Sequence, residues 1–158
     1  MDTKYMKMAI DEAKSGTEYD EVPIGAIIVK DGEVIASAHN EKEQHKCSIY
    51  HAEIVAIMRA TERLGNWHLD GCDMYVTLEP CAMCAGAIIN SRIANVYFGA
   101  YDSKAGCLGT LYNLPEDTRF NHRAHVEGGI LEEECAMLLS DYFRAKRIAK
   151  KNAKDTKI

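Results

Sequence analysis

The sequence predicts an α/β fold with a central mixed sheet and helices packed on its faces. Segments with the apolar spacing of amphipathic helices alternate with short runs rich in β-branched residues. Such alternation is typical of a sheet covered by helices. The length of 158 residues, with 47% apolar and 27% charged residues, suits one globular domain over residues 1–158.

The first half of the chain is expected to contain two helices and a hairpin. Apolar residues recur at helical spacing in two segments, which Gly16 and Gly65 follow as stop signals. Asp31 and Gly32 separate two β-branched runs, which is a strong hairpin signal. The polar stretch before the second helix lacks periodicity and predicts a loop. These elements are a helix over 3–14, strands over 22–29 and 34–36, a loop over 39–50 and a helix over 51–64.

The second half adds further strands and two helices. Short β-branched and aromatic runs predict the strands. Pro80 suits the first position of a helix, and small and apolar residues follow it. Gly128 and Gly129 separate a short strand from a long final helix. These elements are a strand over 74–78, a helix over 81–89, a strand over 95–99, an irregular segment over 100–121, a strand over 124–127 and a helix over 131–151.

Composition predicts a cytoplasmic chain with no membrane partner. No apolar run approaches the ~18–20 residues that cross a bilayer, and the first residues lack the apolar segment of a secretory signal. Six cysteines in such a chain should be reduced, which favours metal binding or burial over disulfides. Because Cys47, Cys72, Cys107 and Cys135 have no partner at ligand spacing, we expect small buried side chains there.

Charge is distributed unevenly along the chain. The 19 basic and 24 acidic residues give a net charge of −5, which by itself disfavours a nucleic-acid partner. Residues 144–158 reverse that sign, with seven basic residues against one acid. Two interpretations of this basic end stay open, a phosphate-contacting end of the last helix or a solvated tail that aids solubility.

Two short motifs carry the chemistry, His-Ala-Glu at 51–53 and Pro-Cys-Ala-Met-Cys at 80–84. Cys81 and Cys84 lie three residues apart and share one face of the expected helix. With His51 as a third ligand they form a set suited to Zn²⁺. Three protein ligands leave a fourth position for water, which is typical of catalytic rather than structural zinc.

Glu53 completes the pattern. It lies two residues after His51, where it could move protons to and from that water without binding the metal. His-x-Glu followed by Pro-Cys-x-x-Cys is the established signature of zinc deaminases. Ordinary core residues or a redox pair are alternatives, but a redox pair explains neither His51 nor Glu53. Glu79, just before Pro80, is expected to be a structural carboxylate that caps the following helix.

At these motifs the chain resembles the bacterial tRNA adenosine deaminases, which convert the wobble adenosine of an arginine tRNA anticodon to inosine. The zinc motif alone specifies only the wider cytidine and deoxycytidylate deaminase superfamily. The resemblance to the tRNA enzymes covers nearly the whole chain and is carried by segments 21–26, 51–54, 75–87, 91–93, 98–100, Asp102 with Lys104, 121–123, 129–131 and 138–144.

The resemblance implies a three-layer α/β/α cytidine-deaminase-like fold with a central mixed sheet. It also implies a homodimer, one Zn²⁺ per subunit and a tRNA anticodon stem-loop as substrate. The implied metal ligands are His51, Cys81 and Cys84, with Glu53 as the catalytic residue. Asn40 would contact the flipped base and Ile24 would line the pocket. The full set of implied substrate-binding residues is Asn40, Ile24, Ala52, Asp102, Asn121, His122 and Phe143.

One segment departs from the family pattern. Residues 47–50 are Cys-Ser-Ile-Tyr, where the family usually has an Asp-Pro-Thr-Ala-like stretch. The resemblance therefore does not predict the shape of the neighbouring pocket. For Phe143, which could stack on an unstacked base, a core position is an alternative. For Asp102 the alternative is an ordinary turn residue.

The expected reaction is hydrolytic deamination of an adenosine flipped out of a single-stranded RNA loop. A small-molecule deaminase acting on guanine, cytosine or a free nucleoside is a rival hypothesis, since its zinc site could look identical. A non-catalytic, zinc-stabilised RNA-binding module is another, but it does not explain a carboxylate beside a three-ligand set. The basic end and segment 121–123 favour RNA over a free base.

Overall fold

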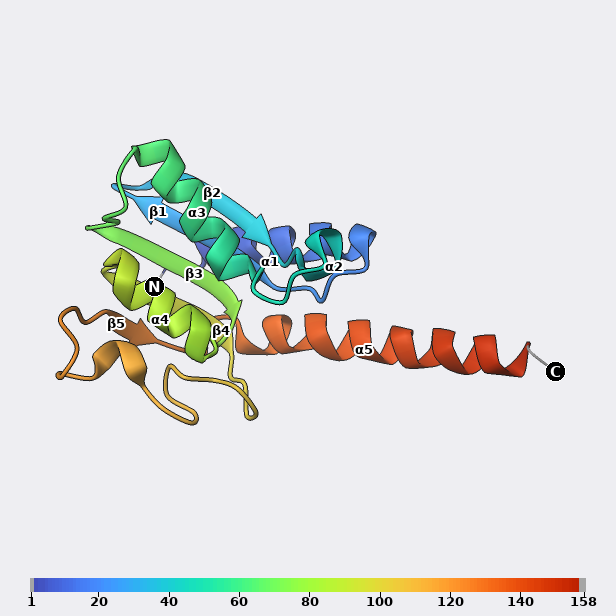
Figure 1. The fold of residues 1–158 in the computed structure, drawn as a ribbon. Helices are drawn as coiled ribbons and strands as arrows, with labels where there is room; N and C mark the ends of the chain where they lie inside the picture. The colour runs from blue at the N-terminus through green and yellow to red at the C-terminus, as the bar shows by residue number, and fades with distance from the viewer. Residues whose placement is uncertain (1, 157–158) are drawn as a thin grey trace.

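A five-stranded mixed sheet of order β2-β1-β3-β4-β5 forms the centre of the molecule (Figure 1). In the computed structural model, which describes residues 2–156, β1 pairs antiparallel with β2 and β3, whereas β3, β4 and β5 run parallel. The strands are β1 (Gly25–Lys30), β2 (Glu33–His39), β3 (Cys72–Leu78), β4 (Asn95–Ala100) and β5 (His125–Glu127).

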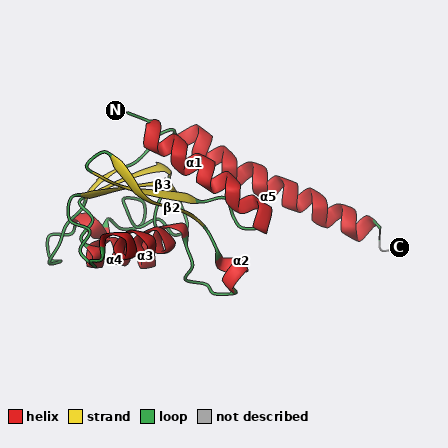
Figure 2. Cartoon of the chain, turned by 90° about the horizontal axis from the view of Figure 1, so that it is seen from above, coloured by secondary structure: helices red, strands yellow, loops and turns green. Residues whose placement is uncertain are grey.

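Helices cover both faces of the sheet, so the predicted three-layer α/β/α fold is confirmed (Figure 2). Helices α1 (Lys4–Gly16) and α5 (Glu132–Asp155) lie on one face, and α3 (Ala52–Leu64) and α4 (Ala82–Ser91) lie on the other. Successive strand residues point to opposite faces and feed two apolar clusters. Met74 and Val76 belong to the cluster under α3 and α4, whereas Tyr75 belongs to the cluster under α1.

The turn between β1 and β2 has the geometry that the sequence predicted. Asp31 and Gly32 both have positive φ, 49° and 78°, as a two-residue hairpin turn requires. Of the cysteines outside the motifs, Cys72, Cys107 and Cys135 are buried as expected, while Cys47 is half-buried.

Several boundaries differ from the expectation, and two of these differences have a clear physical reason. The segment expected to be a loop over 39–50 contains a one-turn helix, α2 (Lys42–His45), which is too short to show periodicity. The helix expected from residue 81 begins at Ala82, because Cys81 is its extended N-cap residue. The remaining connections contain the 3₁₀ turns η1 (Thr17–Tyr19) and η2 (Leu114–Glu116).

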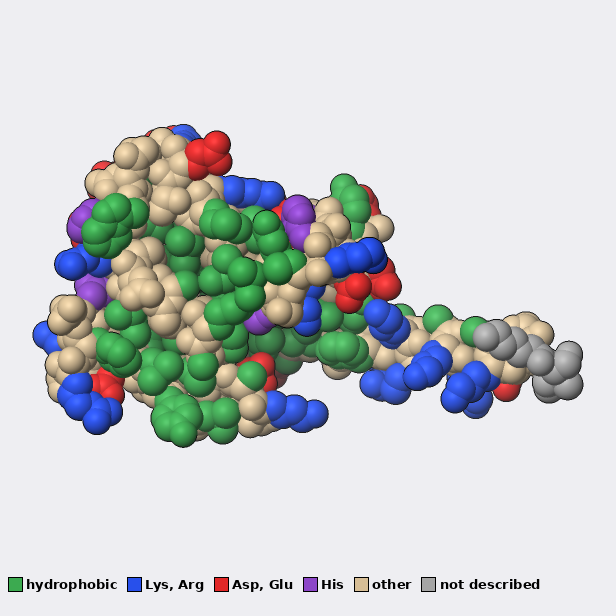
Figure 3. All heavy atoms as spheres, in the orientation of Figure 1, with side chains coloured by type: hydrophobic (Ala, Val, Ile, Leu, Met, Phe, Trp, Pro, Cys, Tyr) green, Lys and Arg blue, Asp and Glu red, His purple; other side chains and the backbone are tan. Residues whose placement is uncertain are grey.

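Helix α5 continues well past the sheet (Figure 1). Its first turn carries three glutamates and its last part is rich in lysine and arginine, so its charges complement the helix dipole at both ends. Lys and Arg side chains gather on this projecting part in Figure 3. The helix is longer than expected, ending at Asp155 rather than at residue 151.

Within residues 2–156, no helix combines the length and the apolar character needed to cross a membrane.

Candidate active site

The two sequence motifs meet on the α3 and α4 side of the sheet, where two helices begin. His51 is the N-cap residue of α3 and Cys81 that of α4, while Cys84 lies in the first turn of α4. The Nδ1 atom of His51 is 3.7 Å from the Sγ of Cys81 and 3.5 Å from the Sγ of Cys84. All three ligand atoms lie within 4.8 Å of one another.

This donor set fits a tetrahedral zinc ion. Zn–N and Zn–S bonds of about 2.0–2.3 Å at tetrahedral angles place a nitrogen and a sulfur ligand about 3.6 Å apart. The observed separations of 3.5 and 3.7 Å match that value. Two thiols and an imidazole are also the ligand types that zinc prefers. The three residues can therefore hold the metal without rearrangement of the backbone.

The protons of the three ligands are linked. A hydrogen bond from the Cys84 thiol, with further help from His51, lowers the pKa of Cys81 to about 3 despite burial. The same bond, together with burial, raises the pKa of Cys84. The hydrogen bond to Cys81 raises the pKa of His51, and burial and then the charge of Lys42 oppose that shift. A metal ion must displace the protons held by this set.

Glu53 lies in the first turn of α3 and is 4% exposed. It does not belong to the three-ligand group. Burial is the main cause that raises the pKa of its carboxyl, and the charge of His51 opposes the rise. A carboxyl whose pKa is moved toward neutrality can both accept and return a proton, which suits Glu53 to general acid–base catalysis.

A cavity of about 210 Å³ opens at these groups. Its lining residues are Val22, Ile24, Asn40, Lys42, His51, Glu53, Leu78, Glu79, Cys81, Asp102 and Ala105. Asn40 is 4% exposed, and its Oδ1 atom is buried without a hydrogen-bond partner among the described residues. Buried polar atoms are normally paired, so this oxygen is available to a donor on a bound ligand.

Glu79 is structural, as expected, but it does not cap α4. Cys81 is the N-cap residue, and no side chain caps the helix there. The Glu79 carboxylate, 2% exposed, instead accepts hydrogen bonds from the segment over 102–110. The donors are the Asp102 amide, the Leu108 amide, and the amide and hydroxyl of Thr110.

Gly106 shows how closely this segment approaches the carboxylate. A Cβ atom at position 106 would lie 2.3 Å from the Cδ of Glu79, so only glycine fits. The Oδ1 atom of Asp102 accepts hydrogen bonds from the Lys104 and Ala105 amides, which closes a local turn. Asp102 therefore combines the turn role with a position at the cavity.

The structure brings together most of the site residues expected from the sequence. Ile24, Asn40, His51, Glu53, Cys81 and Asp102 line one cavity, and Cys84 completes the ligand group behind it. Ala52 is 1% exposed and packs into the core. Phe143 is 44% exposed on α5, so the alternative of a core position is wrong.

Two expected residues lie elsewhere within this chain. Asn121 and His122 line a separate hollow with Trp67 and Arg92, near the C-terminal end of α4. His122 Nε2 is 2.7 Å from the carbonyl oxygen of Ile93. A single chain therefore does not bring this pair to the cavity.

Sequence reasoning missed Lys42 as a cavity residue, although its place two residues after Asn40 was a usable signal. The atypical segment over 47–50 does not line the cavity. Tyr50 packs against the core and stacks on His45, with ring centroids 4.1 Å apart.

Comparisons with known proteins agree with this geometry. The model of a family described as MafB19-like deaminase matches residues 1–147. The tRNA-specific adenosine deaminase of Bacillus subtilis (strain 168) is 55% identical over 153 residues, which cover 97% of this chain and 95% of that one.

Two solved structures have a fold similar to that of this chain. One, from studies of A-to-I editing by tRNA:A34 deaminases at the wobble position of transfer RNA, has a TM-score of 0.83 and 43% identity, covering 87% of this chain and all of that one. A guanine deaminase from Bacillus subtilis is less similar, with a TM-score of 0.62 and 36% identity, covering 70% and 71% of the two chains. With identity of this extent over nearly the whole chain, the protein belongs to the family of tRNA-specific adenosine deaminases.

Proposed function

We propose that this chain catalyses the hydrolytic deamination of the wobble adenosine to inosine in the anticodon of tRNA, with an arginine tRNA as substrate. The observation that carries the proposal is the three-ligand group of His51, Cys81 and Cys84, which adjoins a cavity with the buried carboxyl of Glu53. A purely structural zinc site would need neither an open position nor such a carboxyl.

The proposed cofactor is one Zn²⁺ per subunit. When bound, zinc supplies Lewis-acid activation that makes a water molecule nucleophilic at neutral pH. Glu53 accepts one proton from the attacking water and delivers it to the ring nitrogen, then accepts the second proton of that water and delivers it to the departing amine. Water and adenosine are thereby converted to inosine and ammonia. The raised pKa of Glu53 suits it to both halves of this exchange.

The remaining cavity residues bind the flipped base. The unpaired Oδ1 of Asn40 accepts a hydrogen bond from the base, and Ile24 supplies an apolar wall. For Ala52, whose side chain is buried, the proposed contact is through its backbone. Asp102 at the cavity contacts the anticodon loop, and exposed Phe143 stacks on an unstacked base.

Asn121 and His122 are proposed to reach the anticodon loop within a homodimer, since a single chain holds them away from the cavity. Exposed apolar side chains support such an assembly. Met58 on α3 is 44% exposed and Met83 on α4 is 36% exposed. Figure 3 looks onto this layer, and hydrophobic side chains gather over it. We place the enzyme in the cytoplasm, where its tRNA substrate is found.

Guanine or another free base is the rival substrate, because the similar guanine deaminase shares the fold. The projecting basic part of α5 favours RNA, since a free base offers no phosphate to it.

The test is incubation of the zinc-loaded protein with an anticodon stem-loop that contains a wobble adenosine. Inosine should form at that position, and the matched stem-loop with guanosine there should stay unchanged. Free adenosine, guanine and cytosine serve as competing substrates. Absence of inosine from a protein with one zinc per chain, or faster turnover of a free base, would overturn the proposal.

A further inference from the structure

One wall of the cavity is formed by Asn40 and by Lys42 at the start of α2, and it carries a single cation. Lys42, the first residue of α2, is the only lysine or arginine among the residues that line the cavity. The same lining includes three carboxylates, Glu53, Glu79 and Asp102. Without Lys42, an anionic substrate would meet only acidic groups at this cavity. The lysine therefore points to a negatively charged group on the substrate.

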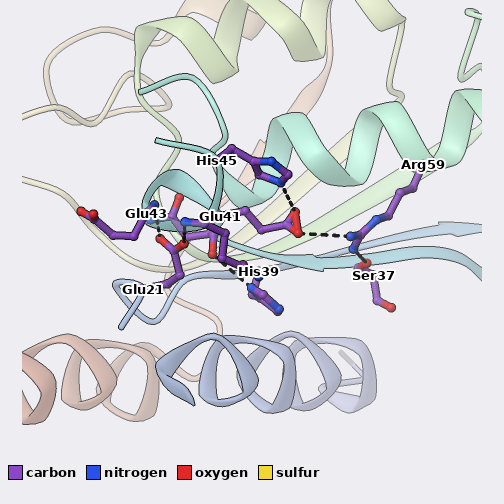
Figure 4. Close-up of polar contacts among 9 residues, drawn as sticks. Glu21, Ser37, His39, Glu41, Glu43, His45 and Arg59 are labelled. Atoms are coloured by element: carbon purple, nitrogen blue, oxygen red, sulfur yellow. Dashed lines mark hydrogen bonds and ion pairs between the residues drawn. The ribbon is translucent and has the colours of Figure 1, made fainter. Parts of the chain in front are cut away.

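Glu21 holds this wall from inside the protein. Its carboxylate is fully buried, and its two oxygens accept hydrogen bonds from the amides of Glu43 and Gln44, at 3.0 and 2.9 Å (Figure 4). The described ion pairs include none to Glu21. Burying a carboxylate is costly, and here only backbone amides compensate for it. The arrangement therefore fixes the turn that carries Lys42.

A second set of contacts fixes the same wall from outside. Glu41 pairs with Arg59 of α3 at 3.4 Å, and Arg59 also donates to the Ser37 carbonyl of β2 at 2.8 Å (Figure 4). The amide of Glu41 donates to the Tyr50 carbonyl at 3.0 Å. The backbone around Lys42 is thus tied to α3, to β2 and, through Glu21, to the connection between α1 and β1, while Lys42 itself is exposed.

The substrate of the proposed function explains the cation. When an adenosine base fills the cavity, the phosphates on either side of its ribose stay at the mouth. A lysine ammonium on a fixed turn is a point charge that suits one of these phosphates. We infer that Lys42 binds a backbone phosphate next to the adenosine in the cavity, and that Glu21 is the positioning residue that holds Lys42 there. This inference rests on the proposed function.

The proposed contact would also make the enzyme prefer RNA to a free nucleoside. A free nucleoside fills the base cavity but has no phosphate for Lys42. Loss of Lys42 should therefore weaken the use of RNA and leave the use of a nucleoside as it is.

The test compares Lys42→Gln with Lys46→Gln in the zinc-loaded protein. Lys46 belongs to the same segment but does not line the cavity, so it is a matched control. With the anticodon stem-loop, Lys42→Gln should raise KM about tenfold rather than lower kcat. The slope of log Kd for the stem-loop against log salt should fall by about 0.7, the value for one single-strand phosphate contact. Lys46→Gln should change neither quantity, and Lys42→Arg should restore both.

Glu21→Gln tests the positioning role. An amide has one acceptor oxygen in place of two, so the turn loses one of its two hydrogen bonds. We expect KM for the stem-loop to rise in the otherwise unchanged protein, but not to rise further in the Lys42→Gln background. Additive effects of the two substitutions would overturn the positioning role. Circular dichroism and zinc content check that each variant is folded.

Two outcomes would overturn the inference for Lys42. One is an unchanged salt slope in Lys42→Gln, and the other is an equal change in Lys46→Gln. Failure of the proposed function gives a different result, namely no inosine from the unmodified protein. In that case the salt slope of stem-loop binding, measured by fluorescence anisotropy, still decides whether Lys42 contacts a phosphate.

Discussion

Glu53 and Glu79 are both buried carboxyls at the cavity, yet their surroundings suit them to different tasks. Glu79 accepts hydrogen bonds from three backbone amides and a hydroxyl of one neighbouring segment. Glu53 lies beside the ligand group, and burial raises the pKa of its carboxyl. A carboxylate saturated with donors holds structure, whereas one with a raised pKa can exchange protons.

The first prediction concerns Glu53. Glu53→Ala should lower turnover of the stem-loop by at least about 10²-fold, because positioned proton transfer contributes roughly 10²–10⁴-fold. The variant should keep one zinc per chain, measured by inductively coupled plasma mass spectrometry. Loss of the metal together with activity would make Glu53 a ligand and contradict its role as a proton carrier.

The second prediction concerns the contact between Glu79 and Gly106. Gly106→Ala should displace the segment over 102–110, because a new Cβ would overlap the Glu79 carboxylate. We expect at least about a tenfold loss of kcat/KM for the stem-loop, since small misplacements of positioning groups are costly. Gly109→Ala is a less suitable control because its φ is 142°, so Gly86→Ala, in open space on α4, serves instead. Equal losses in the two variants would contradict the prediction.

Local chemistry explains which site residues the sequence could predict. His51, Cys81 and Cys84 carry their signal in residue type and short spacing, and the structure brings their ligand atoms together. The partners of Glu79 lie 23 to 31 residues further along an irregular segment, so no local pattern reveals them. Lys42 follows Asn40 by two residues, which was a local signal, but its fixed position at the cavity also depends on the contact between Glu21 and α2, which is not local.

At the scale of elements, the sequence predicted the helices and strands that have a periodic apolar pattern. It did not predict the short turn of α2, which is held by hydrogen bonds to Glu21. The helices that pack on the sheet show their apolar spacing in the sequence, and so do the hairpin strands. Helix α2 has only one turn, which Lys46 follows in the left-handed conformation, so it has no periodic signal. The starts of α3 and α4 were each expected one residue too early, because His51 and Cys81 are extended N-cap residues.

The third prediction concerns the contact between α5 and the α1–β1 connection. Tyr142 donates a hydrogen bond to Asp20 at 3.0 Å, and Lys146 lies 3.4 Å from the same carboxylate. The hydrogen bond from Tyr142, followed by Lys146, lowers the pKa of Asp20 from 3.8. A lowered folded-state pKa means that the contact stabilises above pH 3.8 and that its contribution is lost as the pH falls below the lowered value.

Asp20→Asn should therefore lower the thermal midpoint slightly near pH 6, and the difference from the unmodified protein should shrink as the pH falls toward 3. Glu18→Gln, a change of the nearby acid in η1, is the control and should show no such trend. Differential scanning fluorimetry across this range measures the effect. A difference that stays constant with pH would show that the charge of Asp20 contributes nothing.

At the scale of the whole molecule, the two helix layers differ in what they expose. The α3 and α4 layer adjoins the cavity and exposes Met58 and Met83. The other layer carries α5 and its basic projecting part (Figures 2 and 3). In the proposed homodimer, the exposed methionines lie at the interface and Asn121 of one protomer serves the cavity of its partner.

The fourth prediction tests this assembly. Sedimentation equilibrium should give twice the chain mass of 17.6 kDa for the unmodified protein. Met58→Glu should shift the population to monomer, because an interface would bury the new charge without a partner. Met8→Glu, an exposed methionine on α1 at the opposite layer, should leave the dimer intact. A monomeric unmodified protein, or equal behaviour of the two variants, would contradict the proposal.

The projecting part of α5 has a further consequence for how the chain acquires its shape. Starting a helix in water is unfavourable, and a detached segment as short as residues 144–155 would be marginally helical. The earlier turns of α5 pack against β4 and act as the helix nucleus. The later turns then propagate from this nucleus one residue at a time. At about 1.5 Å per residue, those later turns carry the basic side chains out by about 18 Å. The spacing of these charges therefore depends on the packing of the first turns of α5 against β4. A substitution that weakens this packing would unfold the basic end of the helix even if every lysine were kept.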